Sequence, residues 1–433
     1  MKKNLSRIIS SVLVFALAMS ITACSGGSNG ASSAAGTQGV ASGKGSTATS
    51  ITEVKYWHMC PGDEGAELQK IVNEFNASQN TVKVNAQYVP RDELMKQYTI
   101  GVVSGSLPDI GEVDNPDEAS YVSMGVFEDI TDLFHSWSDA KFLDGPMASC
   151  TYNGKIYGVP RGSNCLGLFY DVDMLQKAGI NPPTNWSELT KACKSLTTGK
   201  VKGLAFSAVA NEEGTFQFMP FLLSAGGNIN DLSSSHSIKA MSYVSTLVKS
   251  GYVNKECINW TQSDVEKQFA AGSASMMING PWNISALKKD APNKHWKVVK
   301  IPKADNGKYA SILGGENLVI CKGCTDKKRI ASWNFIKYIT SKDNSTKLAS
   351  RIGQFSPRSD IDVQAVYKSD EILKVFAGLM PTAQSRGPHV KWPEVSSAIQ
   401  QALQSSITGK QTAQQAMATA KSKVDEINTS LKK

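Results

Sequence analysis

The sequence has little histidine and lacks the short motifs that mark common enzyme and metal sites. Its five histidines show no metal-ligand spacing, and neither an HExxH zinc motif nor a P-loop occurs in the 433 residues. A G-x-S-x-G pattern falls at residues 26–30, in a Ser/Gly-rich stretch with no strand and helix to present a serine nucleophile. These absences argue against metallohydrolase, nucleotide-hydrolysing and serine hydrolase chemistry. A glycoside hydrolase stays open, because any two of the 38 acidic residues could form its carboxylate pair.

Long apolar runs are also scarce, and only the N-terminus has one. Residues 1–23 combine a basic start, a short apolar segment and a small last residue, Ala23, which is typical of a secretory signal peptide. Cys24 follows directly, as in a lipobox whose cysteine receives a lipid, although Ile21 stands where leucine is usual. Residues 24–50 are mostly Ser, Gly, Ala and Thr, a flexible tether. We expect a lipid-anchored protein on the extracellular face of the cell membrane; the alternative is an ordinary signal peptide with a chance cysteine.

The cysteines after Cys24 are odd in number and few, so they cannot form a complete disulfide framework. Seven cysteines follow Cys24, and an odd number cannot pair completely. Cys321 and Cys324 have the spacing of a redox pair or of half a metal site, but no second such pair and no nearby histidine accompanies them. We expect no metal there, and a local disulfide stays open.

Charge of one sign is not concentrated anywhere along the chain. The net charge is +8, and three of those positive charges lie in the first seven residues. The remaining small, scattered excess offers no patch for nucleic acid. The chain is 41% hydrophobic and 19% charged, as globular proteins are. Residues 51–433 are too many for one hydrophobic core and suit two domains.

Strands and helices alternate in the first part of this body. Residues 54–57, 82–88 and 108–110 have the pattern of strands. Between the first two, apolar residues recur at helical spacing across residues 68–75, and a second helix, capped by Asp92, follows the next strand. This order predicts a largely parallel sheet with helices on its faces.

The alternation resumes in the second half of the chain. Strands are expected at residues 166–170 and 275–278, and two amphipathic helices at residues 395–407 and 413–431 close the sequence. Two capping boxes predict helix starts between the two strands. They are Asn185 with Glu188, and Ser263 with Glu266. We therefore expect an α/β fold.

Several short segments, each a turn, a strand end or a helix start, follow one another in a specific order and spacing. They are Gly105–Ile110, Asn153–Pro160, Leu168–Asp171, Lys177–Ile180, Pro182–Leu189, Phe269–Trp282, Ala331–Thr340 and Ile407–Lys410. Together, over roughly residues 51 to 430, they resemble the extracellular solute-binding proteins of ABC transporters. The resemblance is to the sugar-binding branch that includes maltodextrin-binding protein.

The resemblance implies a two-lobed, periplasmic-binding-protein-like fold (type II), in which each lobe is a mixed sheet flanked by helices. It places lobe one at residues 51–163 and 307–357 and lobe two at residues 164–306 and 358–433. A hinge between the lobes would close them on a ligand. The implied function is capture of a mono- or oligosaccharide and its delivery to ABC transporter permease subunits, by a monomer without cofactor or metal. The alternatives are a secreted carbohydrate-active hydrolase and a binding protein that feeds a sensor kinase.

A sugar site needs a flat aromatic ring against the C–H face of the sugar and polar groups around its hydroxyls. The resemblance implies Trp282, after an Asn-Gly-Pro turn, as the stacking ring, with Trp392 and Phe216 as further candidates. Packing in a core is the alternative for each ring. The polar candidates that the resemblance implies are His58, Asp63, Asp114, Asn115 and Asn164. Two glycines before Glu316 let the backbone approach a ligand, from whose hydroxyls Glu316 could accept hydrogen bonds, and Arg386 in a Ser-Arg-Gly turn could form a bidentate clamp. Structural, capping or surface roles are the alternatives for His58, Asp63 and Arg386.

Overall fold

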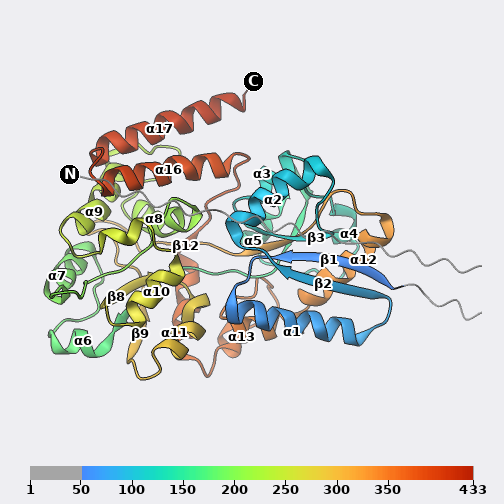
Figure 1. Ribbon diagram of the computed structural model, residues 1–433, viewed down its shortest axis with the longest axis horizontal. Coiled ribbons are helices and arrows are strands. Elements are labelled where there is room, and N and C mark those ends of the chain that lie inside the picture. The colour runs from blue at the N-terminus through green and yellow to red at the C-terminus, as the bar shows by residue number, and fades with distance from the viewer. Residues whose placement is uncertain (1–50, 433) are drawn as a thin grey trace, which may run out of the picture. The chain divides into compact units, whose positions relative to one another are not determined.

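The computed structural model describes residues 51–432, in which two main β-sheets are each surrounded by helices (Figure 1). The predicted signal peptide, the lipidation at Cys24 and the tether lie outside the described residues. Within the described part, no helix combines the length and the apolarity needed to cross a membrane.

The larger sheet has five strands in the order β2-β1-β3-β11-β6 and forms lobe one with the helices on its faces. Strand β1 pairs in parallel with β2 and β3, as predicted, whereas β11 is antiparallel to β3 and β6. The strands are β1 (Thr52–His58), β2 (Val82–Tyr88), β3 (Ile110–Asp114), β6 (Gly158–Pro160) and β11 (Glu316–Ile320). The main helices are α1 (Gly62–Ser78), α2 (Arg91–Ser104), α3 (Glu118–Ser123), α12 (Asp326–Ile339) and α13 (Lys342–Ile352).

Strand β11 is buried on both faces of this sheet. Leu318 and Ile320 pack in the core layer that α1, α12 and α13 cover, whereas Val319 and the following Cys321 pack in the layer that α2 covers. A strand between two layers of helices needs apolar residues at every position, not at alternate ones. Residues from late in the sequence therefore complete a sheet that the first residues of the body begin.

The smaller sheet has three antiparallel strands in the order β8-β7-β9 and forms lobe two with its helices. Leu168 and Tyr170 enter one core layer and Phe169 enters the other. The strands are β7 (Gly167–Asp171), β8 (Met276–Asn279) and β9 (Trp296–Val299). Helices α7 (Trp186–Leu196), α8 (Glu212–Ser224), α9 (Ser235–Lys249), α16 (Trp392–Ile407) and α17 (Ala413–Ser430) contribute to the first layer; α10 (Gln262–Ala270), α11 (Ile284–Asp290) and α15 (Glu371–Leu379) contribute to the second.

Shorter elements connect these main ones. They are α4 (Thr131–His135), α5 (Asp144–Ser149), β4 (Thr151–Tyr152), β5 (Lys155–Ile156), α6 (Val172–Lys177), β10 (Ser311–Ile312), α14 (Val363–Val366), β12 (Ala383–Gln384) and the 3-10 helices η1 (Lys255–Ile258), η2 (Pro281–Asn283) and η3 (Met380–Thr382).

Three segments of the chain pass between the lobes side by side. Ser163 forms a β-bridge with Phe355, and Asn164 forms one with Gly314. Gly315 has a φ of 144°, and a Cβ there would lie 2.2 Å from the carbonyl oxygen of Gly162, so only glycine fits. These crossings are where a hinge would act, and the residue numbers of the lobe boundaries stay a prediction.

Several local predictions are confirmed and others are wrong. Asn185 caps α7 by accepting the backbone N–H of Glu188, as expected. The box at Ser263 and Glu266 is wrong, because the reciprocal pair is Thr261 with Asp264, two residues earlier. Asp92 does not cap α2, which begins after Pro90 with no side-chain cap. In residues 51–432, all seven cysteines are free thiols.

Candidate functional site

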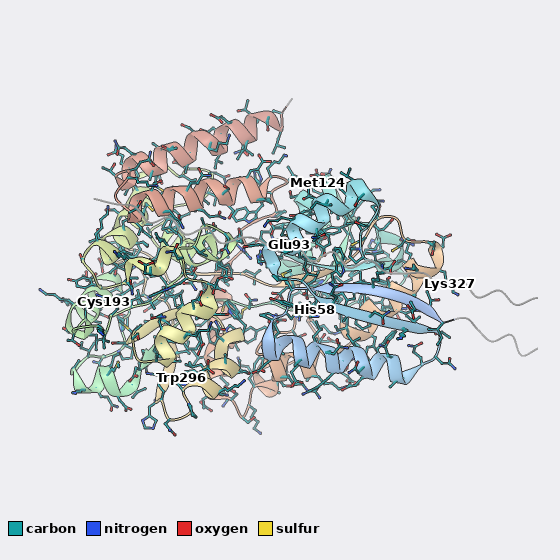
Figure 2. The ribbon with its side chains drawn as sticks, viewed as in Figure 1. His58, Glu93, Met124, Cys193, Trp296 and Lys327 are labelled. Atoms are coloured by element: carbon teal, nitrogen blue, oxygen red, sulfur yellow. The ribbon has the colours of Figure 1, made fainter. Side chains whose placement is uncertain are left out.

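A cavity of about 380 Å³ lies between the two lobes. Lobe one contributes the first turns of α1 and α2 and the start of β11, whereas lobe two contributes the first turns of α8 and α10 and the turn after β8. Helices α1 and α2 each follow a parallel strand, so their N-termini meet at the carboxyl edge of the sheet. Figure 2 shows this place through His58, which ends β1 on the side of lobe one that faces lobe two.

Two aromatic rings form the apolar part of the wall. Trp282, in η2, and Phe216, in α8, have ring centroids 6.1 Å apart with their planes tilted by 46°. The indole folds back over Gly280, where an added Cβ would lie 2.0 Å from the ring. Because no side chain larger than hydrogen fits under it, Gly280 sets the position of the Trp282 ring.

Arg386 joins the two lobes across the cavity. Its guanidinium lies 3.0 Å from the Asp114 carboxylate at the end of β3 and 2.5 Å from the Glu212 carboxylate in α8, and it donates to Asn115 at 3.2 Å. Its Cζ also lies 4.5 Å from the centroid of the Phe216 ring. Burial opposes the charge on Asp114, but Arg386 and a second arginine, in α2, outweigh burial and lower the pKa of that carboxyl.

A second charged network lies under the lobe-one wall and is centred on the fully buried Arg161. Its guanidinium lies 2.5 Å from Glu112, 3.2 Å from Glu316 and 3.7 Å from Glu64. Gln354 accepts a hydrogen bond from Arg161 and donates to both Glu64, at 2.8 Å, and Glu316, at 2.9 Å. Burial raises the pKa of Glu316 to about 8, against the attraction of Arg161.

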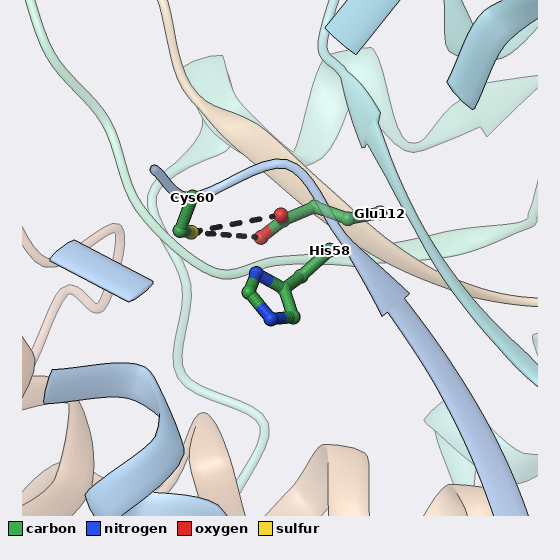
Figure 3. A group of neighbouring side chains, drawn as sticks. All are labelled: His58, Cys60 and Glu112. Atoms are coloured by element: carbon green, nitrogen blue, oxygen red, sulfur yellow. Dashed lines mark hydrogen bonds between the residues drawn. The ribbon is translucent and has the colours of Figure 1, made fainter. Parts of the chain in front are cut away.

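His58, Cys60 and Glu112 meet behind this wall (Figure 3). Their potential ligand atoms lie within 4.8 Å of one another, and all three residues are buried. Arg161 donates to the Cys60 sulfur at 3.3 Å and to Glu112, so a fixed positive charge already occupies the acceptors that a metal ion would need. Burial lowers the pKa of His58, whose ring packs against Tyr88. The cluster supports the cavity wall from behind.

Six of the sequence-predicted residues line the cavity. They are Asp114, Asn164, Phe216, Trp282, Glu316 and Arg386. Asn115 accepts a hydrogen bond from Arg386 but does not itself line the cavity. The contacts that these residues make with a ligand stay a prediction.

Three predicted residues lie elsewhere. Trp392 is fully buried in the core of lobe two, because it continues the apolar stripe of Val395 and Ile399 along α16. Asp63 is exposed in the first turn of α1, and the next residue, Glu64, lines the cavity instead. His58 lies behind the wall and does not line the cavity.

Sequence reasoning missed other residues of the wall. Glu64, Arg91 and Asp92 lie in the first turns of helices that follow parallel strands, and that position was the signal that could have found them. Glu212 and Glu213 lie beside the predicted Phe216 at the start of α8. The local sequence around Gln354 gives no such signal. This residue lines the cavity because it lies in one of the three segments that cross between the lobes.

Comparisons with known proteins agree on one family. A sequence model described as bacterial extracellular solute-binding protein matches residues 70–375. A binding protein of Brucella abortus (strain 2308) is 22% identical over 371 residues, which cover 84% of this chain and 90% of the relative. A lactose-binding protein of Rhizobium radiobacter is 24% identical over 319 residues, 69% of this chain and 72% of the relative.

The fold is similar to that of solved structures as well. The structure of maltose-bound MalE3 of T. maritima superposes with a TM-score of 0.81 at 23% sequence identity, covering 87% of this chain and 100% of that one. This similarity confirms the predicted two-lobed α/β fold with flanking helices in each lobe. The lobe-one sheet is mixed, as predicted, and in lobe two parallel bridges from Ala205 to Met277 and from Lys202 to Ala274 extend the three antiparallel strands.

Proposed function

This chain belongs to the bacterial extracellular solute-binding proteins, and on that premise we propose that it captures a saccharide in the cavity between its lobes. The lobes close on the sugar by a hinge motion at the three crossing segments and deliver it to the permease subunits of an ABC transporter. We propose that it does so as a monomer.

The observation that carries this proposal is the composition of the cavity wall. Trp282 and Phe216 offer ring faces for the C–H side of a sugar, and carboxylates and amides surround them for its hydroxyls. The volume of about 380 Å³ is at the small end of ligand pockets and favours a short saccharide. The lactose-binding relative and the maltose-bound structure support the same ligand class.

The charged network argues for binding over hydrolysis. A glycoside hydrolase needs two carboxyl groups that flank one bond. Glu64 and Glu316 both belong to lobe one, and Arg161 and Gln354 hold them together. Such a pair approaches a bound sugar from one side only, whereas Asp92 and Glu213 reach the cavity from opposite lobes. On the proposed function, incubation with oligosaccharides should produce no new reducing ends.

A thermal-shift screen against a saccharide panel tests the proposal. A ligand at a hundred times its dissociation constant adds about 2.7 kcal/mol to the free energy of unfolding, so at least one saccharide should raise the melting temperature clearly. Amino acids, phosphate and metal ions serve as the comparison set. A melting temperature that responds to a member of that set and to no saccharide would overturn the proposal.

The finer localisation is a prediction about Cys24. We propose that the chain is a lipoprotein held at the extracellular face of the cell membrane by acyl chains on this cysteine, because two chains suffice for stable anchoring. Cys24→Ser should release the protein into the medium, whereas the neighbouring Ser25→Ala should leave it in the membrane fraction. Immunoblots of the two fractions decide. A Cys24→Ser protein that stays with the membrane would contradict the lipid anchor.

A further inference from the structure

Gln354 lies where a crossing between the lobes borders the cavity. The residue is 3% exposed and lines the cavity. The next residue, Phe355, exchanges two backbone hydrogen bonds with Ser163, at 2.7 and 2.8 Å. Tyr367, which packs in the second core layer of lobe two, donates its hydroxyl to the backbone carbonyl of Gln354 at 2.8 Å. The backbone of Gln354 is therefore held at the crossing and by lobe two.

The side chain of Gln354 points into lobe one, where both of its N–H groups and its oxygen are used. Its Nε2 donates to Oε1 of Glu64 at 2.8 Å and to Oε2 of Glu316 at 2.9 Å. Its Oε1 accepts a hydrogen bond from Arg161 at 2.8 Å. A primary amide combines two N–H donors with an acceptor and carries no charge, which is the combination that these three neighbours require.

Glu64 and Glu316 are the acids of this network that reach the cavity. Their side chains are 14% and 16% exposed, whereas Glu112, the third acid around Arg161, has no exposed surface. Glu64 lies in the first turn of α1 and Glu316 begins β11, so the two acids are far apart in the sequence. Because both accept from the same nitrogen of Gln354, their carboxyl groups lie side by side on the cavity wall.

Arg161 does not fix the two carboxyl groups by itself. Its guanidinium lies 3.7 Å from Glu64, which is longer than a good hydrogen bond, and its shortest contact, at 2.5 Å, is with Glu112. Two neighbouring acids also repel each other when both are ionised. The amide of Gln354 supplies a short contact to each of them without adding a charge.

The backbone of a second crossing segment packs against the same amide. An added Cβ at Gly162 would lie 2.2 Å from Oε1 of Gln354, and the three atoms nearest to that position all belong to Gln354. Only glycine therefore lets the chain pass this close to the amide. The position of the amide and the position of the crossing depend on each other.

Resting on the proposed saccharide site, we infer that Gln354 is a positioning residue that holds Glu64 and Glu316 as a pair for two hydroxyls of the sugar. Oε1 of Glu316 makes no hydrogen bond within residues 51–432, so it is free to bond to a ligand. Neighbouring hydroxyls of a sugar ring offer donors and acceptors to such a pair. Gln354 acts through these two acids and links them to the crossing to which its own backbone belongs.

Affinities for deoxy sugars test this inference. Calorimetry compares the saccharide that binds best in the thermal-shift screen with each of its monodeoxy analogues, and the affinity losses together form a hydroxyl profile. Loss of a hydroxyl that bonds to Glu64 or Glu316 should weaken wild-type binding at least roughly tenfold, because a buried carboxyl is left without its partner. Glu64→Ala and Glu316→Ala identify these hydroxyls, since removing them should no longer change the affinity of the variant.

Gln354→Met should change the hydroxyl profile at the same positions, although both acids remain. Methionine keeps the length of the side chain and removes the amide, so the loss for those hydroxyls should fall below about threefold while the other losses stay. Gly162→Ala, whose methyl group displaces the amide, should act in the same direction. Gln79→Met is the matched control. It removes an amide that donates to Val82 at 2.6 Å and accepts from it at 2.8 Å, at the far end of α1, and should leave the profile unchanged.

The outcomes separate this inference from the proposed function. An unchanged hydroxyl profile in Gln354→Met, or an equal loss of affinity for the parent sugar and every analogue, would overturn the inference and leave the saccharide site standing. Failure of every saccharide to bind the wild-type protein would overturn the proposed function itself. The apo melting temperature of each variant reports its folding, and if Gln354→Met does not fold, the result with Gly162→Ala decides.

Discussion

Trp282→Ala should weaken saccharide binding at least roughly thirty-fold. A stacked aromatic ring in a desolvated site contributes about 2 kcal/mol or more on truncation, and every 1.4 kcal/mol is tenfold in affinity. The melting temperature of the apo protein should move little, because the indole is only half-buried, at the edge of the lobe-two core. Calorimetry with the best-binding saccharide and a melting curve without it measure both effects.

Two further variants make this result specific. Gly280→Ala places a methyl group where the indole now lies, so it should displace the ring and weaken binding while the tryptophan is kept. Trp296→Ala removes an indole that packs on Phe169 with centroids 5.6 Å apart, away from the cavity, so it should cost stability and leave affinity unchanged. An apo protein destabilised by Trp282→Ala with unchanged affinity would mark Trp282 as a packing residue.

Arg161→Met should lower the free energy of unfolding by about 3–5 kcal/mol, the usual cost of leaving buried charges without their partner. The guanidinium is fully buried and is the positive charge that Glu64, Glu112 and Glu316 share. Methionine keeps an unbranched side chain of similar length, so the change removes mainly the charge and the hydrogen bonds. Urea unfolding measures the loss.

The size of this loss should depend on pH. Burial already raises the pKa values of Glu64 and Glu316 in the folded protein, and Arg161 opposes that rise. Without Arg161 the folded pKa values move further above the unfolded value of about 4.3. Acids of this kind favour the folded state while protonated, and the contribution disappears as pH rises through the folded pKa. The two proteins differ only where pH exceeds the folded pKa of the wild-type acids, so the loss should be smaller near about pH 6 than near about pH 9.5, above the folded pKa of Glu316 of about 8.

A surface arginine provides the control for this prediction. Arg351 is 36% exposed and lies 3.8 Å from Glu67 and 3.9 Å from Glu74. Exposed pairs of this kind contribute about 0–1 kcal/mol, so Arg351→Met should change stability little at either pH. The role assigned to the buried network would be contradicted if the two substitutions lowered the free energy of unfolding equally. It would also be contradicted if the effect of Arg161→Met did not vary with pH.

The parts of the fold that local patterns could predict are the elements themselves. The apolar face of α1 and the cap at Asn185 follow from the spacing of neighbouring residues, which a single sequence displays. The position of β11 in the first sheet cannot be predicted in this way. Its partner strands β3 and β6 are more than 150 residues away, and residues 316–320 contain no pattern that identifies them. The capping box at Thr261 was missed because a Thr/Asp pair competed with a Ser/Glu pair two residues on.

The candidate site also combines residues that local patterns can predict with contacts that only the folded chain brings together. Trp282 could be predicted from the resemblance and Glu316 from the two glycines before it, and both line the cavity. The buried position of Trp392 could have been predicted from the sequence, since Val395 and Ile399 continue the same face of α16. The bridge from Arg386 to Asp114 joins residues 272 positions apart, and only the folded chain brings them together.

The most direct test of the central claim is a structure determined with the best-binding saccharide. We predict a sugar between the lobes, its ring against Trp282 and Phe216 and its hydroxyls within hydrogen-bond distance of Glu316 or Asn164. A sugar bound elsewhere, such as the groove between α7 and α9 where Trp186 stacks on Tyr243 at 4.1 Å, with the inter-lobe cavity empty, would contradict the account.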